Sequence, residues 1–268
     1  MAPVLKRQRL KAFLLALNLL FIIVSYYTVK TASRSIILED AGSAILPYIW
    51  IGSALLMIFL VPVYQWVCNH VSRFTLLFAT LLATIFSMLV FWVALQTPTI
   101  TEAALFYGFS DIISVVIVEQ FWSLTNSEFR THGARRWYGI IGSGGLIGGL
   151  LGAVLAAQLI ERFGLSTNDL LLVATLFIGV ILATSIYLRS TAMFDESPAT
   201  SADGPAPTPA QVTSENSYLL LVAVILLLAQ LASPFIEYQF MTLVGDQFTD
   251  QDERTVYLSH IFAWISGA

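Results

Sequence analysis

Charged residues are scarce in this sequence. Only 11% of its 268 residues are Asp, Glu, Lys or Arg, whereas soluble domains average about 25%. Hydrophobic residues make up 57%, and the mean hydropathy is +0.79. A soluble globule of this size could not cover its surface with so few charges. The composition therefore predicts an all-α integral membrane protein, a polytopic helix bundle whose partner is the lipid bilayer.

Cysteine and histidine are also rare. The single cysteine excludes an intrachain disulfide and a cysteine-based metal site. No nucleophile–base triad and no NTPase motif is present, so we expect neither an enzyme nor a metal or cofactor site. The net charge of −4 gives no reason to expect nucleic acid as a partner. The residues in question are Cys68 and the widely separated His70, His132 and His260.

Long apolar runs, in contrast, are abundant. A helix that crosses the bilayer needs about 20 mostly apolar residues. Seven complete segments meet this requirement, at 12–33, 44–66, 74–96, 103–126, 137–160, 168–188 and 217–243. An eighth begins near Val256 and is still apolar at Ala268. The first run is too long for the core of a secretory signal, so we interpret it as an uncleaved span.

The positions of the cations predict the orientation. Cytoplasmic segments of membrane proteins carry an excess of Lys and Arg. With the N-terminus in the cytoplasm, nine cations lie inside and four outside. We therefore expect a cytoplasmic N-terminus in a bacterial inner membrane. The inside set is Lys6, Arg7, Arg9, Lys11, Arg73, Arg130, Arg135, Arg136 and Arg189, and the outside set is Lys30, Arg34, Arg162 and Arg254.

A polar segment at 190–217 divides the chain. It is rich in Pro, Ala, Ser and Thr, which is typical of a disordered linker, here a cytoplasmic one. It would separate a six-helix N-terminal half, 1–189, from the start of a C-terminal half, 218–268. This layout is typical of major-facilitator-like transporters. Since a matching second half needs six spans, we expect a truncation after the start of span eight, with roughly 140–150 residues missing.

Charges inside a span cost about 2.5–3.5 kcal/mol each on insertion scales and are therefore candidate functional residues. Lys30 and Arg34 close the first predicted span, four residues apart, and share a helix face. Two cations at this spacing repel each other, and an anion bound between them would reverse the effect. The alternative is anchoring at the outer membrane surface with Glu39 and Asp40 as partners.

The fourth span carries two acids. Asp111 is expected near the middle of the bilayer and Glu119 towards the cytoplasm. On a helical wheel, Trp122 and Asn126 lie near Glu119, with Asp111 to one side. This polar half-face should line a substrate pathway, because lipid would reject it. The alternative is a buried structural cluster that joins neighbouring helices.

Glu237 ends the seventh span, three residues after Pro234. Proline removes a helix hydrogen bond, so a kink or break is expected there. Broken helices beside a charge are common at transport sites. The alternative is an ordinary interfacial Glu next to Tyr238.

Glycines repeat every four residues in the fifth span, at Gly144, Gly148 and Gly152. Such a pattern lets two helices pack closely. It is not a P-loop, because no Lys-Ser/Thr follows, and no strand precedes it as a dinucleotide fingerprint requires.

Arg135 and Arg136 precede the glycine pattern. Cytoplasmic arginines at such a position fix topology and contact lipid phosphates. The alternative role is an inner gate that pairs with an acid across the two halves.

Three stretches form a distinctive set, namely 118–122 (VEQFW) with Asn126, 134–139 (ARRWYG) and the glycine-rich 142–152. Residues 26–38, 46–48 and 237–240 add support. With this set the chain resembles the bacterial and plastid ATP/ADP translocase family of NTP/NDP exchangers and nucleotide:proton symporters, a branch of the major facilitator superfamily. The resemblance covers nearly the whole chain.

That resemblance implies twelve spans and nucleotide exchange or uptake without hydrolysis. It matches the family's basic position in span one to Lys30 or Arg34 and its acidic position in span four to Glu119. We therefore expect a secondary active transporter of a nucleotide or another small organic anion, with a coupling proton or counter-substrate. The alternatives are a major-facilitator-type transporter of an unrelated solute and a non-transporting truncated membrane protein.

Overall fold

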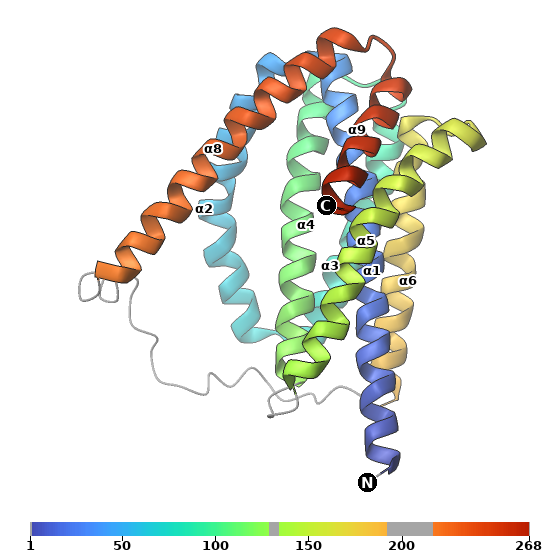
Figure 1. Ribbon diagram of the computed structural model, residues 1–268, viewed down its shortest axis with the longest axis vertical. Coiled ribbons are helices and arrows are strands. Elements are labelled where there is room, and N and C mark those ends of the chain that lie inside the picture. Colours follow the sequence, from blue (N-terminus) through green and yellow to red (C-terminus); the bar gives the residue numbers. More distant parts are fainter. Residues whose placement is uncertain (1, 129–133, 192–216, 268) are drawn as a thin grey trace.

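The computed structural model describes residues 2–128, 134–191 and 217–267, and within these ranges it is helical without strands (Figure 1). Seven helices are long and apolar enough to cross a membrane. The prediction of an all-α membrane helix bundle is therefore confirmed. The elements are α1 Ala2–Ala41, η1 Ser43–Ile45, α2 Leu46–His70, α3 Arg73–Ala94, α4 Ile100–Glu128, α5 Ala134–Phe163, η2 Thr167–Asp169, α6 Leu170–Ser190, α8 Ser217–Gln247 and α9 Gln251–Gly267.

The helices run alternately up and down (Figure 1). One end of the bundle holds the N-terminus, the α2–α3 turn, the start of α5 and the end of α6, and we call it the N-terminal end. Most of the predicted linker, 192–216, lies outside the described residues. Arg135 and Arg136 belong to the first turn of α5 at this end. Their side chains lie outside the described part, and so does the gate predicted for them.

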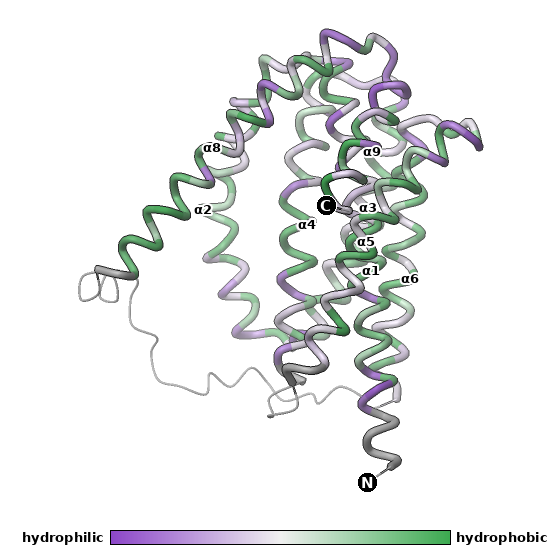
Figure 2. The backbone as a smooth tube through the Cα atoms, viewed as in Figure 1, coloured by the Kyte–Doolittle hydropathy of each residue, from purple (hydrophilic) through white to green (hydrophobic). Residues whose placement is uncertain are grey.

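The helix α1 is the centre of the bundle. It packs against α4, α5, α6 and α9, and 56% of its most apolar window is buried. By contrast, α2 and α8 lie at one side (Figure 1), with 6% and 0% of the corresponding windows buried. The α8 helix is hydrophobic along most of its length (Figure 2). Such a face suits lipid rather than water.

Glycines let α5 approach α1 closely. A Cβ atom at Gly148 would lie 2.7 Å from the Leu20 carbonyl oxygen. At Gly152 it would lie 2.8 Å from the Cα of Val24, and at Gly144 it would overlap the carbonyl of Ala16. Three glycines spaced by four therefore meet three α1 residues spaced by four, backbone against backbone, as in small-xxx-small packing. These glycines face a neighbouring helix and not lipid.

Helix α1 continues to Ala41, beyond the predicted end at 33. Gly42, with φ of 67°, ends it in the left-handed conformation that glycine tolerates best. The polar residues Ser33, Arg34 and Ser35 do not end the helix, because they are buried in the bundle and not in water. As a result, Lys30 lies about 16 Å before the end of α1 rather than close to it.

Two further boundaries differ from the predictions. The helix α9 begins at Gln251 rather than near Val256, because the carboxylate of Asp250 accepts hydrogen bonds from the backbone amides of Asp252 and Glu253, both at 2.9 Å. The helix α8 continues through Pro234 without the predicted break. Proline is tolerated inside membrane helices where its surroundings satisfy the freed backbone groups.

Candidate functional site

A buried arginine joins three helices. The side chain of Arg34 on α1 is 5% exposed. Its Nη1 lies 3.0 Å from Asp111 Oδ1 on α4, and its Nη2 and Nε both lie 3.2 Å from Glu237 Oε1 on α8. The sequence proposed all three as separate candidates, and the structure brings them together. The guanidinium offsets one of the two negative charges, which removes part of the cost of placing these groups inside the bundle.

Two aromatic residues complete this site, which we call the Arg34 cluster (Arg34, Asp111, Glu237, Tyr107 and Trp50). The Tyr107 ring centroid lies 4.7 Å from the guanidinium carbon, and its hydroxyl donates to Glu237 Oε1 at 3.4 Å. Trp50 Nε1 donates to the Tyr107 hydroxyl at 3.1 Å. Sequence reasoning missed both. A signal for Tyr107 exists, since it lies one turn before Asp111 on the same face of α4.

Lys30 does not share the partners of Arg34. Among the described residues, no carboxylate lies within ion-pair distance of its ammonium group. Instead, its Nζ lies 4.8 Å from the ring centroid of Phe262, 5.4 Å from that of Tyr26 and 6.0 Å from that of Tyr27. Cations at this distance from aromatic rings are attracted to them. The two first-span cations are thus stabilised separately, one by acids and one by aromatic rings.

A pocket adjoins Lys30. It has a volume of about 490 Å³ and lies between α1, α8 and α9, next to the Arg34 cluster. Glu237 lines it as well, so the pocket and the cluster share one carboxylate. Most of the remaining wall is apolar. Pockets of about 300–1,000 Å³ with apolar walls and few polar groups are typical of small-molecule sites.

The second predicted group lies elsewhere on α4. Trp122 stacks on Tyr138 of α5, with ring centroids 6.0 Å apart, and the Tyr138 hydroxyl donates to Asn126 Oδ1 at 2.8 Å. Glu119 is exposed and lies two turns from Asp111, towards the N-terminal end of the bundle. The sequence grouped Asp111 with Glu119, whereas in the structure Asp111 belongs to the Arg34 cluster. Tyr138 had not been proposed as a site residue.

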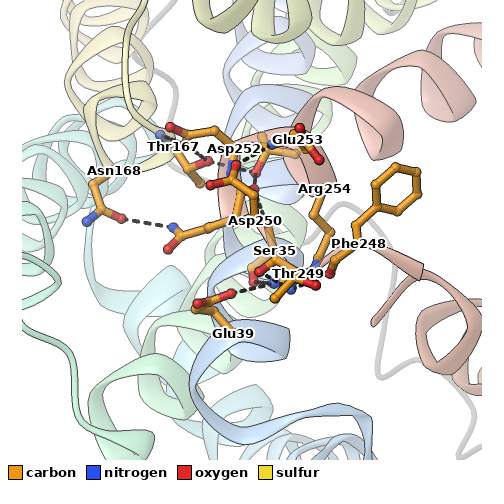
Figure 3. Close-up of polar contacts among 12 residues, drawn as sticks. Ser35, Glu39, Thr167, Asn168, Phe248, Thr249, Asp250, Asp252, Glu253 and Arg254 are labelled. Carbon is orange, nitrogen blue, oxygen red and sulfur yellow. Dashed lines mark hydrogen bonds and ion pairs between the residues drawn. The ribbon is translucent and has the colours of Figure 1, made fainter. Parts of the chain in front are cut away.

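A second buried arginine, Arg254 of α9, makes contacts at the opposite end of the bundle (Figure 3). It is 3% exposed. Its Nη1 donates to the Ser35 carbonyl at 3.1 Å and lies 3.2 Å from Glu39 Oε2, and its Nη2 donates to the Phe248 carbonyl at 2.8 Å. The sequence counted Arg254 as a loop cation and considered Glu39 as a partner for Lys30 or Arg34. The structure pairs Glu39 with Arg254 instead.

The start of α9 is also tied to the α5–α6 connection (Figure 3). Asp252 Oδ1 accepts from the backbone amide of Thr167 at 2.7 Å and from its hydroxyl at 2.6 Å. The Ser35 hydroxyl donates to the Gln251 carbonyl at 2.6 Å. We call these contacts, with those of Arg254, the Arg254 network. It holds α9 against α1 and η2 at this end.

Neither arginine site contains the side chains of a metal centre. In the described part of the chain, no group of three or more His, Cys, Asp or Glu side chains could hold a metal ion. The polar groups of the Arg34 cluster and the Lys30 pocket can bind, orient and release a charged solute. Comparison with models of known protein families gives no match, and comparison with curated proteins gives none either.

Proposed function

We propose that this chain acts in secondary active transport, moving a small organic anion across the membrane by alternating access in the manner of the major facilitator superfamily. The observation that carries the proposal is the Arg34 cluster. It joins α1 and α4, from the six helices before residue 190, with α8, which follows residue 217. Ion pairs between two moving halves can break in one state and form again in the other.

The depth of the cluster supports this role. Asp111 lies about 16 Å from the start of α4, and Glu237 lies about 15 Å from the end of α8. A hydrophobic layer about 30 Å thick that is centred on these helices would contain both acids. Ionisable residues at such depth mark substrate and ion pathways by default, and transporter sites lie near the midplane between repeats.

Each predicted residue has a place in this proposal. Lys30 contacts the anion. When Arg34 breaks its ion pair with Asp111 or Glu237, the freed carboxylate takes up a coupling proton. Glu119, Trp122 and Asn126 line the route towards the N-terminal end, which is cytoplasmic in a bacterial inner membrane. Arg135 and Arg136 close that route as an inner gate. The family resemblance adds a nucleotide as the first substrate to test, with exchange for a second nucleotide as the alternative to proton coupling.

The test is uptake by proteoliposomes that contain the protein at its full encoded length. Labelled ATP, ADP and smaller organic anions are offered with and without a proton gradient. We expect saturable uptake that Asp111→Asn and Glu237→Gln abolish, while Arg162→Gln, which changes an exposed cation outside the cluster, leaves it intact. If only an unrelated solute were taken up, the proposal of transport would stand and the proposal of an anionic substrate would be wrong.

Absence of uptake of every solute, with folded protein and tight vesicles, would contradict transport. The non-transporting reading would then explain the Arg34 cluster as a purely structural link between helices. In that case the same two variants should lower the unfolding temperature and have no other effect.

A further inference from the structure

The Lys30 pocket has a polar end and apolar walls. Lys30 and Glu237 line one part of it, and Ser233 adds a hydroxyl. Most of the other lining side chains are aliphatic or aromatic, among them Ile236, Met241 and Ile265. The walls therefore offer contact to hydrocarbon, and only the Lys30 end offers recognition of a charge.

Lys30 is the group that can accept a new partner. Arg34 already has both acids, whereas the ammonium of Lys30 has aromatic rings around it and, in the described part of the chain, no carboxylate within ion-pair distance. An ammonium group has three hydrogen-bond donors. Cation–π contacts leave these donors free for an oxyanion, and a charge-assisted bond to one would be strong in this apolar setting.

We propose that this pocket binds an amphiphile with one anionic group, a phosphate or a carboxylate, which pairs with Lys30 while the alkyl or aryl body packs against α8 and α9. This inference rests on the proposed transport function and narrows its substrate class. One cation at the pocket matches one anionic group. Glu237 lines the same pocket and would repel the further charges of a nucleoside triphosphate.

The surroundings of the pocket fit a substrate that enters from the membrane. In the part of the chain that the structure describes, the walls formed by α8 and α9 are exposed at Ile236, by 68%, and at Ile265, by 65%. An amphiphile dissolved in the bilayer reaches such exposed walls directly.

The test measures saturable binding of radiolabelled octyl phosphate to the full-length protein in phosphatidylcholine nanodiscs. We expect saturable binding that inorganic phosphate, ATP and octylammonium do not displace. Lys30→Gln should weaken it about ten- to a hundred-fold, the range for a lost charged hydrogen bond, and Lys30→Arg should retain most of it. Ala232→Trp should also weaken binding, because Ala232 lines the pocket.

Two variants serve as controls. Arg9→Gln removes an exposed cation near the N-terminus, and Ala223→Trp adds the same bulk to an exposed α8 position outside the pocket. Both should bind octyl phosphate as the unmodified protein does. Nanodiscs that contain phosphatidylglycerol form a further arm. If this anionic lipid displaces octyl phosphate completely, the site belongs to a bilayer lipid and the inference is wrong.

Other outcomes separate this inference from the transport proposal. Binding of octyl phosphate that neither Lys30→Gln nor Ala232→Trp changes would show partitioning into lipid and overturn the inference. Uptake of ATP without octyl phosphate binding would overturn it too, while leaving transport standing. If octyl phosphate bound in a Lys30-dependent way and no solute were taken up by proteoliposomes, the proposed binding pocket would be supported and the transport proposal would be wrong.

Discussion

Arg34 and Glu237 are 203 positions apart in the chain and meet inside the bundle, where Nε and Nη2 of the arginine both lie 3.2 Å from the same carboxylate oxygen. Tyr107 donates to that oxygen as well. One oxygen thus connects α1, α4 and α8. Any movement of α8 relative to the other two helices must break or rearrange these contacts.

Removing the guanidinium should destabilise the protein more than removing another cation. Arg34→Met leaves Asp111 and Glu237 close together without a counter-charge. Breaking a buried pair in this way costs about 3–5 kcal/mol, and we expect the lower end because both acids are partly exposed. Thermal unfolding in nanodiscs measures the loss. Arg162→Met, at an exposed position, is the control and should change little. Equal stability of both variants would mean that the cluster does not hold the helices together.

The glycines of α5 allow a direct comparison of Gly142 and Gly144, two positions that are two residues apart and have different surroundings. Gly144→Ala should force α5 away from α1, because the new Cβ overlaps the Ala16 carbonyl, and overpacking costs about 1–3 kcal/mol. Gly142→Ala meets nothing within 4 Å and should be neutral or slightly stabilising. Folded yield and unfolding temperature are the readouts. Gly148→Leu should be worse than Gly144→Ala, and a Gly144→Ala variant as stable as Gly142→Ala would refute the close α1–α5 packing.

Loss of Arg254 should loosen the start of α9. Arg254→Gln leaves the Ser35 and Phe248 carbonyls without their charged donor, at about 1.5–3 kcal/mol for a hydrogen bond to a charged group. Glu39→Gln removes only the ion pair to a side chain that is 43% exposed, worth about 0–1 kcal/mol. Hydrogen exchange over 248–255 should therefore accelerate far more in the first variant. Faster exchange in Glu39→Gln than in Arg254→Gln would show that the Arg254–Glu39 ion pair, and not the hydrogen bonds to the carbonyls, stabilises the start of α9.

The orientation can be checked with reporter fusions. Fusions at Ala202 and at Gln251 should report opposite sides of the membrane, with Ala202 cytoplasmic, because the cation count places the N-terminal end inside. A fusion at Thr97, in the α3–α4 connection, should agree with Gln251. Cytoplasmic activity at both Ala202 and Gln251 would refute the predicted topology.

The sequence alone predicts the helices well where hydropathy decides. Segments of about 20 apolar residues cannot leave backbone groups unpaired in lipid and must be helical. Hydropathy fails at the end of α1 and at the start of α9, where polar residues continue the helix. The side chains of Arg34 and Glu39 are satisfied by residues distant in sequence, and a window of local residues contains no trace of those partners.

For the candidate charged residues, too, the sequence predicts one part and the packing of the helices decides the other. Their presence inside apolar segments is enough to single out Lys30, Arg34, Asp111 and Glu237, since such charges are costly in lipid. Which of them pair is decided by packing. The α1 helix brings Arg34 to two acids on different helices and turns Lys30 towards Phe262, although both cations share one helix face. Composition and hydropathy determined a membrane helix bundle with buried charges, whereas the contacts of α4, α8 and α9 with α1 decided which cation is neutralised and which faces a pocket.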